Sequence, residues 1–147
     1  MKTRYVLLIL TVLALFALIT VGAFVTADEA GNACGSQIGT DYPLCQGQFF
    51  PPLQVAAIAE WSHRVLASLS ALLLFVTTFL YWRAKDSPRS ARRSLYVASA
   101  IIVFEIALGA AVVASEESLA WLVTLHQANA MLVFGLASMA SAFAYKS

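Results

Sequence analysis

Three ionisable side chains stand close together in an otherwise apolar part of this sequence. They belong to the segment Glu60-Trp61-Ser62-His63-Arg64, in which Glu60 and His63 are three positions apart and Glu60 and Arg64 are four apart. At this spacing the three side chains share one face of an α-helix. Ionisable groups are costly inside a membrane, so they predict a functional site that faces the interior of a helix bundle.

The other histidine of the chain, His126, also lies in an apolar segment. His63 stands twenty residues before Arg83, and His126 stands twenty residues before Lys146. At about 1.5 Å per residue, both histidines are about 30 Å from a basic residue, and therefore at one depth. Imidazole is a common axial ligand of heme iron, and such sites are built inside helix bundles. We therefore expect a shared heme or metal site; the alternative is two unrelated histidines, each bonded to backbone or to a neighbouring helix.

The charged residues near the histidines have both structural and functional interpretations. Glu60 and Arg64 could form an i,i+4 ion pair that only neutralises charge at the mouth of the helix. Alternatively, Arg64 binds a heme propionate, and Glu60 lies beside the reacting group as a proton carrier or as a partner for a developing cation. A further acidic residue, Glu105, is about 18 Å from Arg93 and is expected to bond to a neighbouring helix, with a direct role as the alternative.

The composition places these residues in a lipid bilayer. The 147 residues are 61% hydrophobic and 12% charged, with a mean hydropathy of +0.79. A soluble domain is closer to half apolar and a quarter charged, so we expect one integral membrane domain, residues 1–147. The net charge of +1 says nothing about nucleic acid, but no basic cluster is interleaved with aromatic residues, so no nucleic-acid partner is expected. The sequence also contains no zinc, phosphate-loop or serine-triad pattern.

Four apolar segments are long enough to cross the bilayer. They predict an all-α bundle of four transmembrane helices, at residues 5–27, 54–82, 94–115 and 119–145. The first segment could instead be a secretory signal cleaved after Ala27. Its uncharged run of 23 residues is longer than the apolar core of a signal, about 7–15 residues, so we interpret it as a membrane helix.

Basic residues indicate how the bundle is oriented. Eight of the nine lysines and arginines lie at the chain ends or between the second and third helices: Lys2, Arg4, Arg83, Lys85, Arg89, Arg92, Arg93 and Lys146. By the positive-inside rule, both termini are expected to be cytoplasmic, in a multi-pass protein of the plasma membrane. The loop at residues 28–53 would then face the extracytoplasmic side.

A weak internal repeat suggests how the helices pair. Residues 19–29 (ITVGAFVTADE) align with residues 106–116 (IALGAAVVASE), and each segment leads through a loop into a helix with one histidine. The repeat predicts two helical hairpins related by a pseudo-twofold axis along the membrane normal. Chance similarity between apolar helices is the alternative.

The loop contains both cysteines of the chain, Cys34 and Cys45. On an oxidising side of the membrane they are expected to form a disulfide. Such a bond would stabilise the fold by about 3 kcal/mol in the chain-entropy model. The alternative is a redox pair that exchanges electrons or thiols with a partner.

Four segments, taken in order, carry a resemblance that spans nearly the whole chain. They are Ala33-Cys34, Tyr42-Pro43-Leu44-Cys45-Gln46-Gly47, Glu60-Trp61-Ser62-His63-Arg64 and Leu125-His126-Gln127-Ala128-Asn129-Ala130. Together they resemble the heme A synthase family, whose members oxidise the C8 methyl group of heme O to a formyl group and so produce heme A.

The resemblance implies a function for each of the residues singled out above. His63 and His126 would be axial ligands of heme iron, the heme being heme b, the substrate heme O or the product heme A. Glu60 would be the catalytic carboxylate, and Cys34 and Cys45 the pair in the outer loop. The implied partners are heme O, the lipid bilayer, a heme O synthase and an electron acceptor.

The sequence departs from the usual pattern of that family in three ways. Most members have eight helices in two similar halves, each with a histidine pair, whereas here there is one half and one pair. We therefore expect one heme site per chain or a homo-oligomer. Cys34 and Cys45 are farther apart than is usual, and Glu105 stands where glutamine is common.

Three other functions are open to a chain of this kind. A b-type cytochrome subunit that only passes electrons would use the two histidines and Arg64, but would have no use for Glu60 or the cysteine loop. A quinone-linked thiol oxidoreductase usually needs a second cysteine pair, and it leaves the histidines unexplained. A purely structural subunit would not account for the buried charges.

Overall fold

The computed structural model describes residues 2–37, 39–41, 44–116 and 118–145. In these ranges it contains four long helices and no strand: α1 (Lys2–Ala27), α2 (Val55–Arg83), α3 (Arg89–Ala114) and α4 (Ala120–Tyr145). All four are long and apolar enough to cross a membrane. The predicted all-α four-helix bundle is confirmed. Tyr42, Pro43 and Lys146, on which parts of the sequence analysis rest, lie outside the described residues.

The helices are longer than the span of apolar residues because their ends reach beyond the hydrocarbon core. The shortest have 26 residues and α2 has 29, which corresponds to about 39–44 Å against a core of about 30 Å. Accordingly, α3 begins at Arg89 rather than at the predicted Ser94. Pro88 precedes it with φ −58° and extended ψ 135°, a conformation that leads directly into the first helical turn.

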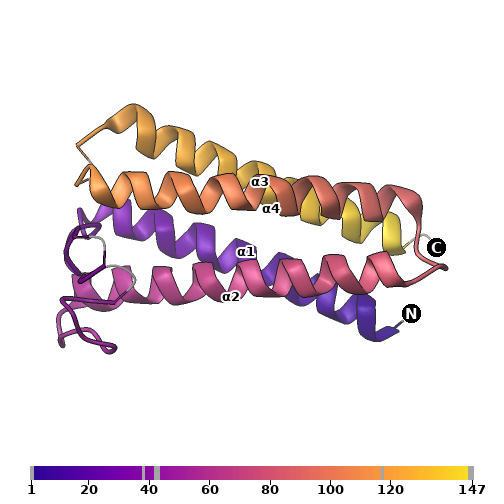
Figure 1. Ribbon diagram of the computed structural model, residues 1–147, viewed down its shortest axis with the longest axis horizontal. Coiled ribbons are helices and arrows are strands. Elements are labelled where there is room, and N and C mark those ends of the chain that lie inside the picture. Colours follow the sequence, from indigo (N-terminus) through magenta and orange to yellow (C-terminus); the bar gives the residue numbers. More distant parts are fainter. Residues whose placement is uncertain (1, 38, 42–43, 117, 146–147) are drawn as a thin grey trace.

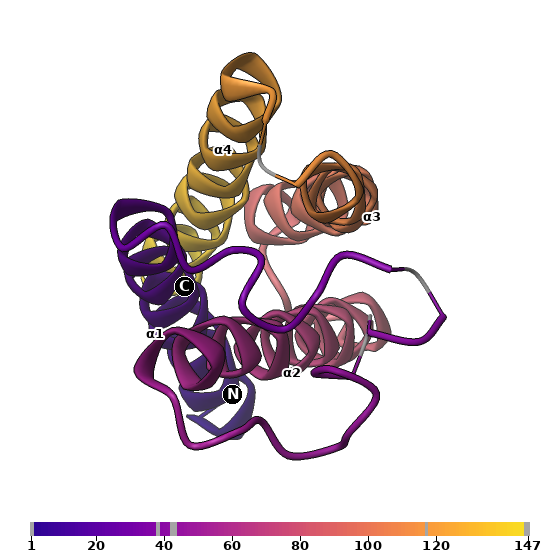
Figure 2. The same ribbon diagram turned by 90° about the vertical axis from the view of Figure 1, so that its left-hand side faces the viewer.

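The helices form two antiparallel hairpins that lie side by side. α1 packs mainly against α2 and α3 mainly against α4, while smaller contacts join α1 to α4 and α2 to α3. Figure 1 shows that both chain ends and the α2–α3 turn lie at one end of the bundle, hereafter the terminal end. The segment between α1 and α2 and the α3–α4 turn lie at the other, the loop end, which faces the viewer in Figure 2.

The half of the bundle toward the terminal end is the closely packed part. Its core consists of one tyrosine and of leucines and other aliphatic residues separated by alanines, and small side chains such as alanine let membrane helices approach closely. The buried members are Leu8, Leu15, Ala71, Leu74, Tyr81, Ala91, Leu95, Ala98, Ile102, Val133, Ala137 and Ala140. This packed half fixes the helix positions from which the loop end is built.

Two hydroxyl pairs join neighbouring helices in this half. Thr11 Oγ1 of α1 and Thr77 Oγ1 of α2 are 2.9 Å apart and buried. Thr78 of α2 and Ser99 of α3 have their hydroxyl oxygens 2.8 Å apart. Because lipid offers no competing water, such hydroxyl pairs contribute to helix association in a membrane.

The Thr11–Thr77 pair provides a test of the α1–α2 interface. Thr77→Val keeps the shape of the side chain and removes the hydroxyl, and hydrogen bonds between membrane helices average about 0.6 kcal/mol. We expect the free energy of unfolding in mixed micelles to fall by about this amount. Thr20→Val is the matched control, because the exposed Thr20 hydroxyl bonds the Phe16 carbonyl of its own helix. An equal effect of the two substitutions would contradict the pairing.

Candidate functional site

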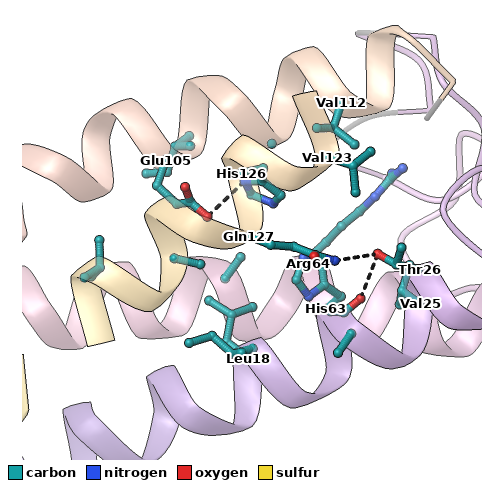
Figure 3. A pocket seen from close by; sticks show the side chains of 18 of the residues that line it. Leu18, Val25, Thr26, His63, Arg64, Glu105, Val112, Val123, His126 and Gln127 are labelled. Atoms are coloured by element: carbon teal, nitrogen blue, oxygen red, sulfur yellow. Dashed lines mark hydrogen bonds and ion pairs between the residues drawn. The ribbon is translucent and has the colours of Figure 1, made fainter. Parts of the chain in front are cut away.

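A cavity of about 380 Å³ lies between the two hairpins and is lined by residues of all four helices. Its wall is mostly apolar, and its volume is in the range of small-molecule and cofactor pockets. The titratable residues that line it are Glu60, His63, Arg64, Glu105 and His126. Both histidines and the three charged residues of the predicted membrane segments therefore meet at one place. Figure 3 shows four of these residues: His63, Arg64, Glu105 and His126.

His63 lies on α2 with its imidazole against α1. A Cβ atom placed on Gly22 would be 2.8 Å from His63 Cε1, so the ring occupies the space that a glycine leaves open. The Leu18 backbone of α1 interacts with the ring, but the buried Nδ1 has no hydrogen bond of regular geometry. The ring is thus held mainly by packing.

His126 lies on α4 in a corresponding arrangement against α3. A Cβ atom placed on Gly109 would be 3.1 Å from His126 Cε1. Gly22 and Gly109 are aligned positions of the internal repeat, and each is followed in its hairpin by a histidine that packs against it. This shared contact supports the pseudo-twofold relation between the hairpins and gives the repeat a physical basis. Neither glycine was predicted as a site residue, although the two are aligned in the repeat.

The two histidines differ in what surrounds their Nδ1 atoms. Glu105 Oε1 of α3 is 2.9 Å from His126 Nδ1. The other carboxylate oxygen, Oε2, accepts a hydrogen bond of 2.7 Å from Asn129 Nδ2, one turn along α4 from His126. Glu105 therefore bonds to a neighbouring helix, as expected, and Asn129 is a second residue that the sequence analysis did not single out.

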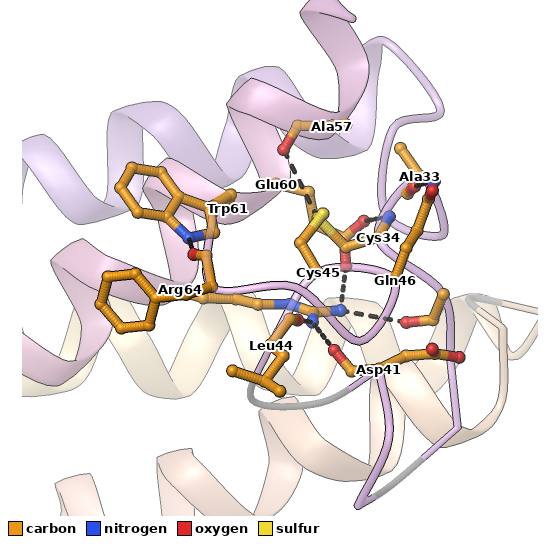
Figure 4. Close-up of a disulfide and its surroundings, with 12 residues drawn as sticks. Ala33, Cys34, Asp41, Leu44, Cys45, Gln46, Ala57, Glu60, Trp61 and Arg64 are labelled. Atoms are coloured by element: carbon orange, nitrogen blue, oxygen red, sulfur yellow. Dashed lines mark hydrogen bonds and ion pairs between the residues drawn. A yellow bond between two sulfur atoms is a disulfide. The ribbon is translucent and has the colours of Figure 1, made fainter. Parts of the chain in front are cut away.

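Glu60 and Arg64 form the expected i,i+4 ion pair inside the bundle, with only 3% and 9% of each residue exposed. The pair also binds the loop. Arg64 donates to the carbonyls of Asp41 (2.8 Å) and Gly35 (3.1 Å) and to that of Leu44. Figure 4 shows the guanidinium extended among these loop carbonyls. The Arg64 guanidinium therefore both neutralises the charge of Glu60 and binds the loop.

The loop also binds the Glu60 carboxylate, through the backbone of a cysteine that is part of the disulfide. Cys34 and Cys45 are bonded to each other and fully buried, so the predicted disulfide is present. The Cys34 backbone N–H donates to Glu60 Oε2 at 2.6 Å. On the other side of the loop, Trp61 Nε1 donates to the Phe49 carbonyl at 2.8 Å. The cysteines do not line the cavity, but they fix the backbone that binds Glu60.

The residues around the cavity fit a heme group. A porphyrin supplies four nitrogen ligands to its iron, so the protein needs to add at most two, and imidazole is a standard choice. Here two imidazoles from α2 and α4 border one apolar cavity, each beside a glycine that keeps space open. Among the described residues there is no cluster of three or more histidine, cysteine or acidic side chains suited to a bare metal ion.

Comparison with known protein families assigns the chain. The COX15-CtaA family of cytochrome oxidase assembly proteins matches residues 1–138. The chain belongs to this family. The curated relatives described below are heme A synthases, in agreement with the resemblance found from the sequence motifs.

The similarity to individual relatives covers most of this chain but a minor part of theirs. The chain is 31% identical over 134 residues to the heme A synthase of Bacillus pumilus, which covers 89% of this chain and 42% of the relative. It is 29% identical over 126 residues to the heme A synthase of Bacillus licheniformis, which covers 86% of this chain and 40% of the relative. The Symbiobacterium thermophilum enzyme is 35% identical over 92 residues, 63% of this chain and 29% of the relative. The chain thus spans less than half the length of these family members, and no solved structure matches it.

Substitution of the glycines tests whether the histidine rings occupy the spaces described. Gly135→Ala in α4 places a methyl group in open space and should gain about 0.5–1 kcal/mol of helix stability. In Gly22→Ala the methyl group meets the His63 ring, and overpacking of this kind costs about 1–3 kcal/mol. We expect thermal unfolding in detergent to rank Gly135→Ala as most stable, Gly109→Ala as intermediate and Gly22→Ala as least stable. Equal melting temperatures would place the His63 ring elsewhere.

Proposed function

We propose that the chain acts as a heme A synthase-like membrane oxidoreductase that oxidises the C8 methyl group of heme O to a formyl group. In this proposal His63 and His126 are the axial ligands of the heme iron. The observation that carries it is the meeting of two histidines from different hairpins at one apolar cavity, directly beside a buried carboxylate.

The cavity suits an apolar porphyrin that enters from the lipid. Heme O carries a long isoprenoid chain and partitions into the bilayer, so it would enter between helices rather than from water. The contacts between the hairpins, α1 with α4 and α2 with α3, are less extensive than those within them. Entry between the hairpins would therefore disturb the least packing. The bound iron, when present, supplies the redox chemistry.

Glu60 is the group proposed to act on the methyl carbon's protons. It lies one helical turn from His63 toward the loop end and borders the cavity. Both of its oxygens are bonded, one by Arg64 and one by the Cys34 N–H. These contacts hold the carboxylate in a single orientation and balance its charge in a medium of low dielectric. Glu60 is thus arranged to accept a proton or to stabilise positive charge that develops at the substrate.

Arg64 is proposed to bind a heme propionate in addition to the loop. A guanidinium presents five N–H donors and a permanent positive charge. Because Arg64 already donates to Glu60 and to three loop carbonyls, a propionate would be attracted mainly by this charge or would replace a loop carbonyl. Its contacts with Glu60 and the loop carbonyls place the cation at the cavity wall. Loop position and propionate binding would then depend on the same side chain.

The partners and cellular placement belong to the same proposal. A homo-oligomer, a heme O synthase and an electron acceptor are proposed as partners from the family resemblance. The plasma membrane is the proposed location, with the cysteine loop on its extracytoplasmic side.

Co-expression with a heme O synthase, in a host that lacks heme A, tests the activity. Extraction and chromatography of the hemes should reveal heme A or a hydroxylated precursor. Loss of a general acid or base typically costs about 10²–10⁴-fold, so Glu60→Ala should reduce this product by at least about 100-fold. Asp28→Ala, which removes an exposed carboxylate near the same end of the bundle, should leave it unchanged.

The same extraction separates the proposal from its competitors. Bound heme B with unconverted heme O would indicate an electron-transfer cytochrome. A protein that contains no heme would contradict the histidine pair itself. Product formation that is unchanged in Glu60→Ala would support the activity but show that Glu60 is not its catalytic carboxylate.

A pair of serine substitutions tests the proposed orientation. Ser118 near the α3–α4 turn and Ser90 at the start of α3 are both exposed and lie at opposite ends of the bundle. In intact cells, a membrane-impermeant maleimide should label Ser118→Cys and leave Ser90→Cys unlabelled until the cells are broken. The reverse pattern would place the cysteine loop in the cytoplasm.

A further inference from the structure

We propose that Glu105 is a positioning residue that acts through His126 and makes the two heme-binding histidines unequal. This inference rests on the proposed function, because it takes His126 as an axial ligand. It assigns a purpose to a buried acidic residue that the reaction proposed above does not use.

The Glu105 carboxylate is held between two groups of α4. One oxygen is 2.9 Å from His126 Nδ1 and the other accepts the 2.7 Å hydrogen bond from Asn129. Only 8% of Glu105 is exposed, so lipid and water compete little for these contacts. The contact with Nδ1 is close but is not aligned as a linear hydrogen bond. It therefore restricts where the ring can turn, and a small rotation of the ring would complete the bond.

The other hairpin has no counterpart of this arrangement. When Gly22 is aligned with Gly109, the position of Glu105 corresponds to Leu18. When His63 is aligned with His126, the position of Asn129 corresponds to Leu66. Two polar residues of the second hairpin thus replace two leucines of the first. Because both hairpins pack their histidine against a glycine, the polar pair is not needed to seat the ring.

A carboxylate beside a ligating histidine has well-defined consequences. It favours the tautomer with hydrogen on Nδ1, which leaves Nε2 to face the metal, and it raises the basicity of the ligand. A more basic ligand stabilises ferric over ferrous iron, so the midpoint potential falls. By this argument His126 is the oriented, strongly donating ligand. Neither Nδ1 has a regular hydrogen bond, but the His63 ring has the Leu18 backbone beside it where His126 has the Glu105 carboxylate. His63 is therefore the weaker ligand and the one next to Glu60.

The competing explanation is that Glu105 only joins α3 to α4 through Asn129. The two explanations differ in what each substitution should change. Asn129→Leu removes the hydrogen bond to Glu105 and leaves the carboxylate beside the ring. Glu105→Gln removes the negative charge and keeps a side chain of the same size. A purely structural role predicts similar effects for both substitutions.

The experiment uses the full chain, purified in detergent and loaded with ferric protoporphyrin IX. The readouts are the heme dissociation constant, the low-spin electron paramagnetic resonance spectrum and the midpoint potential. Glu105→Gln should weaken heme binding by about 10-fold, change the low-spin g values and shift the potential to more positive values. Asn129→Leu should shift the potential much less. Glu105→Asp keeps the charge, so its midpoint potential should be closer to that of the unsubstituted chain than the potential of Glu105→Gln.

The possible results separate this inference from the function on which it rests. If the unsubstituted chain shows bis-histidine ligation that is lost in His126→Ala, and Glu105→Gln changes neither potential nor g values, the inference alone is overturned. Equal effects of Glu105→Gln and Asn129→Leu also overturn it, in favour of helix joining. A chain that binds no heme overturns both proposals. If Glu105→Gln does not fold, the other two variants decide. The inference is supported if the midpoint potential of Glu105→Asp is close to the original and that of Asn129→Leu shifts little. A large shift in Asn129→Leu refutes it.

Discussion

The buried ion pair between Glu60 and Arg64 is the interaction on which the loop end of the bundle depends. Two charges inside a bilayer are tolerated when each has a partner and further hydrogen bonds. Here the additional bonds come from the loop, through the Cys34 N–H and the carbonyls of Gly35 and Asp41. The pair and the loop therefore satisfy each other, and the disulfide holds the loop backbone in the shape that this exchange requires.

The site arises from a difference in packing between the two halves of the bundle. Toward the terminal end, alanines and leucines fill the space between helices. Toward the loop end, Gly22 and Gly109 leave room that the two imidazoles occupy, and the cavity lies between them. The loop also reaches the second hairpin, since Asn32 donates to the Glu116 carbonyl at 2.9 Å. The two hairpins are thus joined by the loop at one end of the bundle and by the α2–α3 turn at the other.

The two hairpins share a framework and carry different chemistry. Each presents one histidine against one glycine, as the internal repeat suggests. The first adds Glu60 and Arg64 on the side of the loop, and the second adds Glu105 and Asn129 deeper in the bundle. In the proposed function, these unequal polar groups would let the second hairpin hold a bound porphyrin while the first acts on it. This division follows from four side chains rather than from any change of fold.

The four helices and the common face of Glu60, His63 and Arg64 follow from the sequence alone. In lipid every backbone hydrogen bond must be made within the segment, so a long apolar run is a helix, and helical spacing then assigns faces. The equal depth of His63 and His126 is a prediction from the same regular rise. The start of α3 at Arg89 was missed, because the charges that mark the edge of the hydrocarbon core do not mark the end of a helix. Only the packing of helices decided that Arg64 turns to the loop, that glycines adjoin both rings and that Glu105 reaches His126. These contacts join residues from different segments, and the spacing along one helix contains no information about its neighbours.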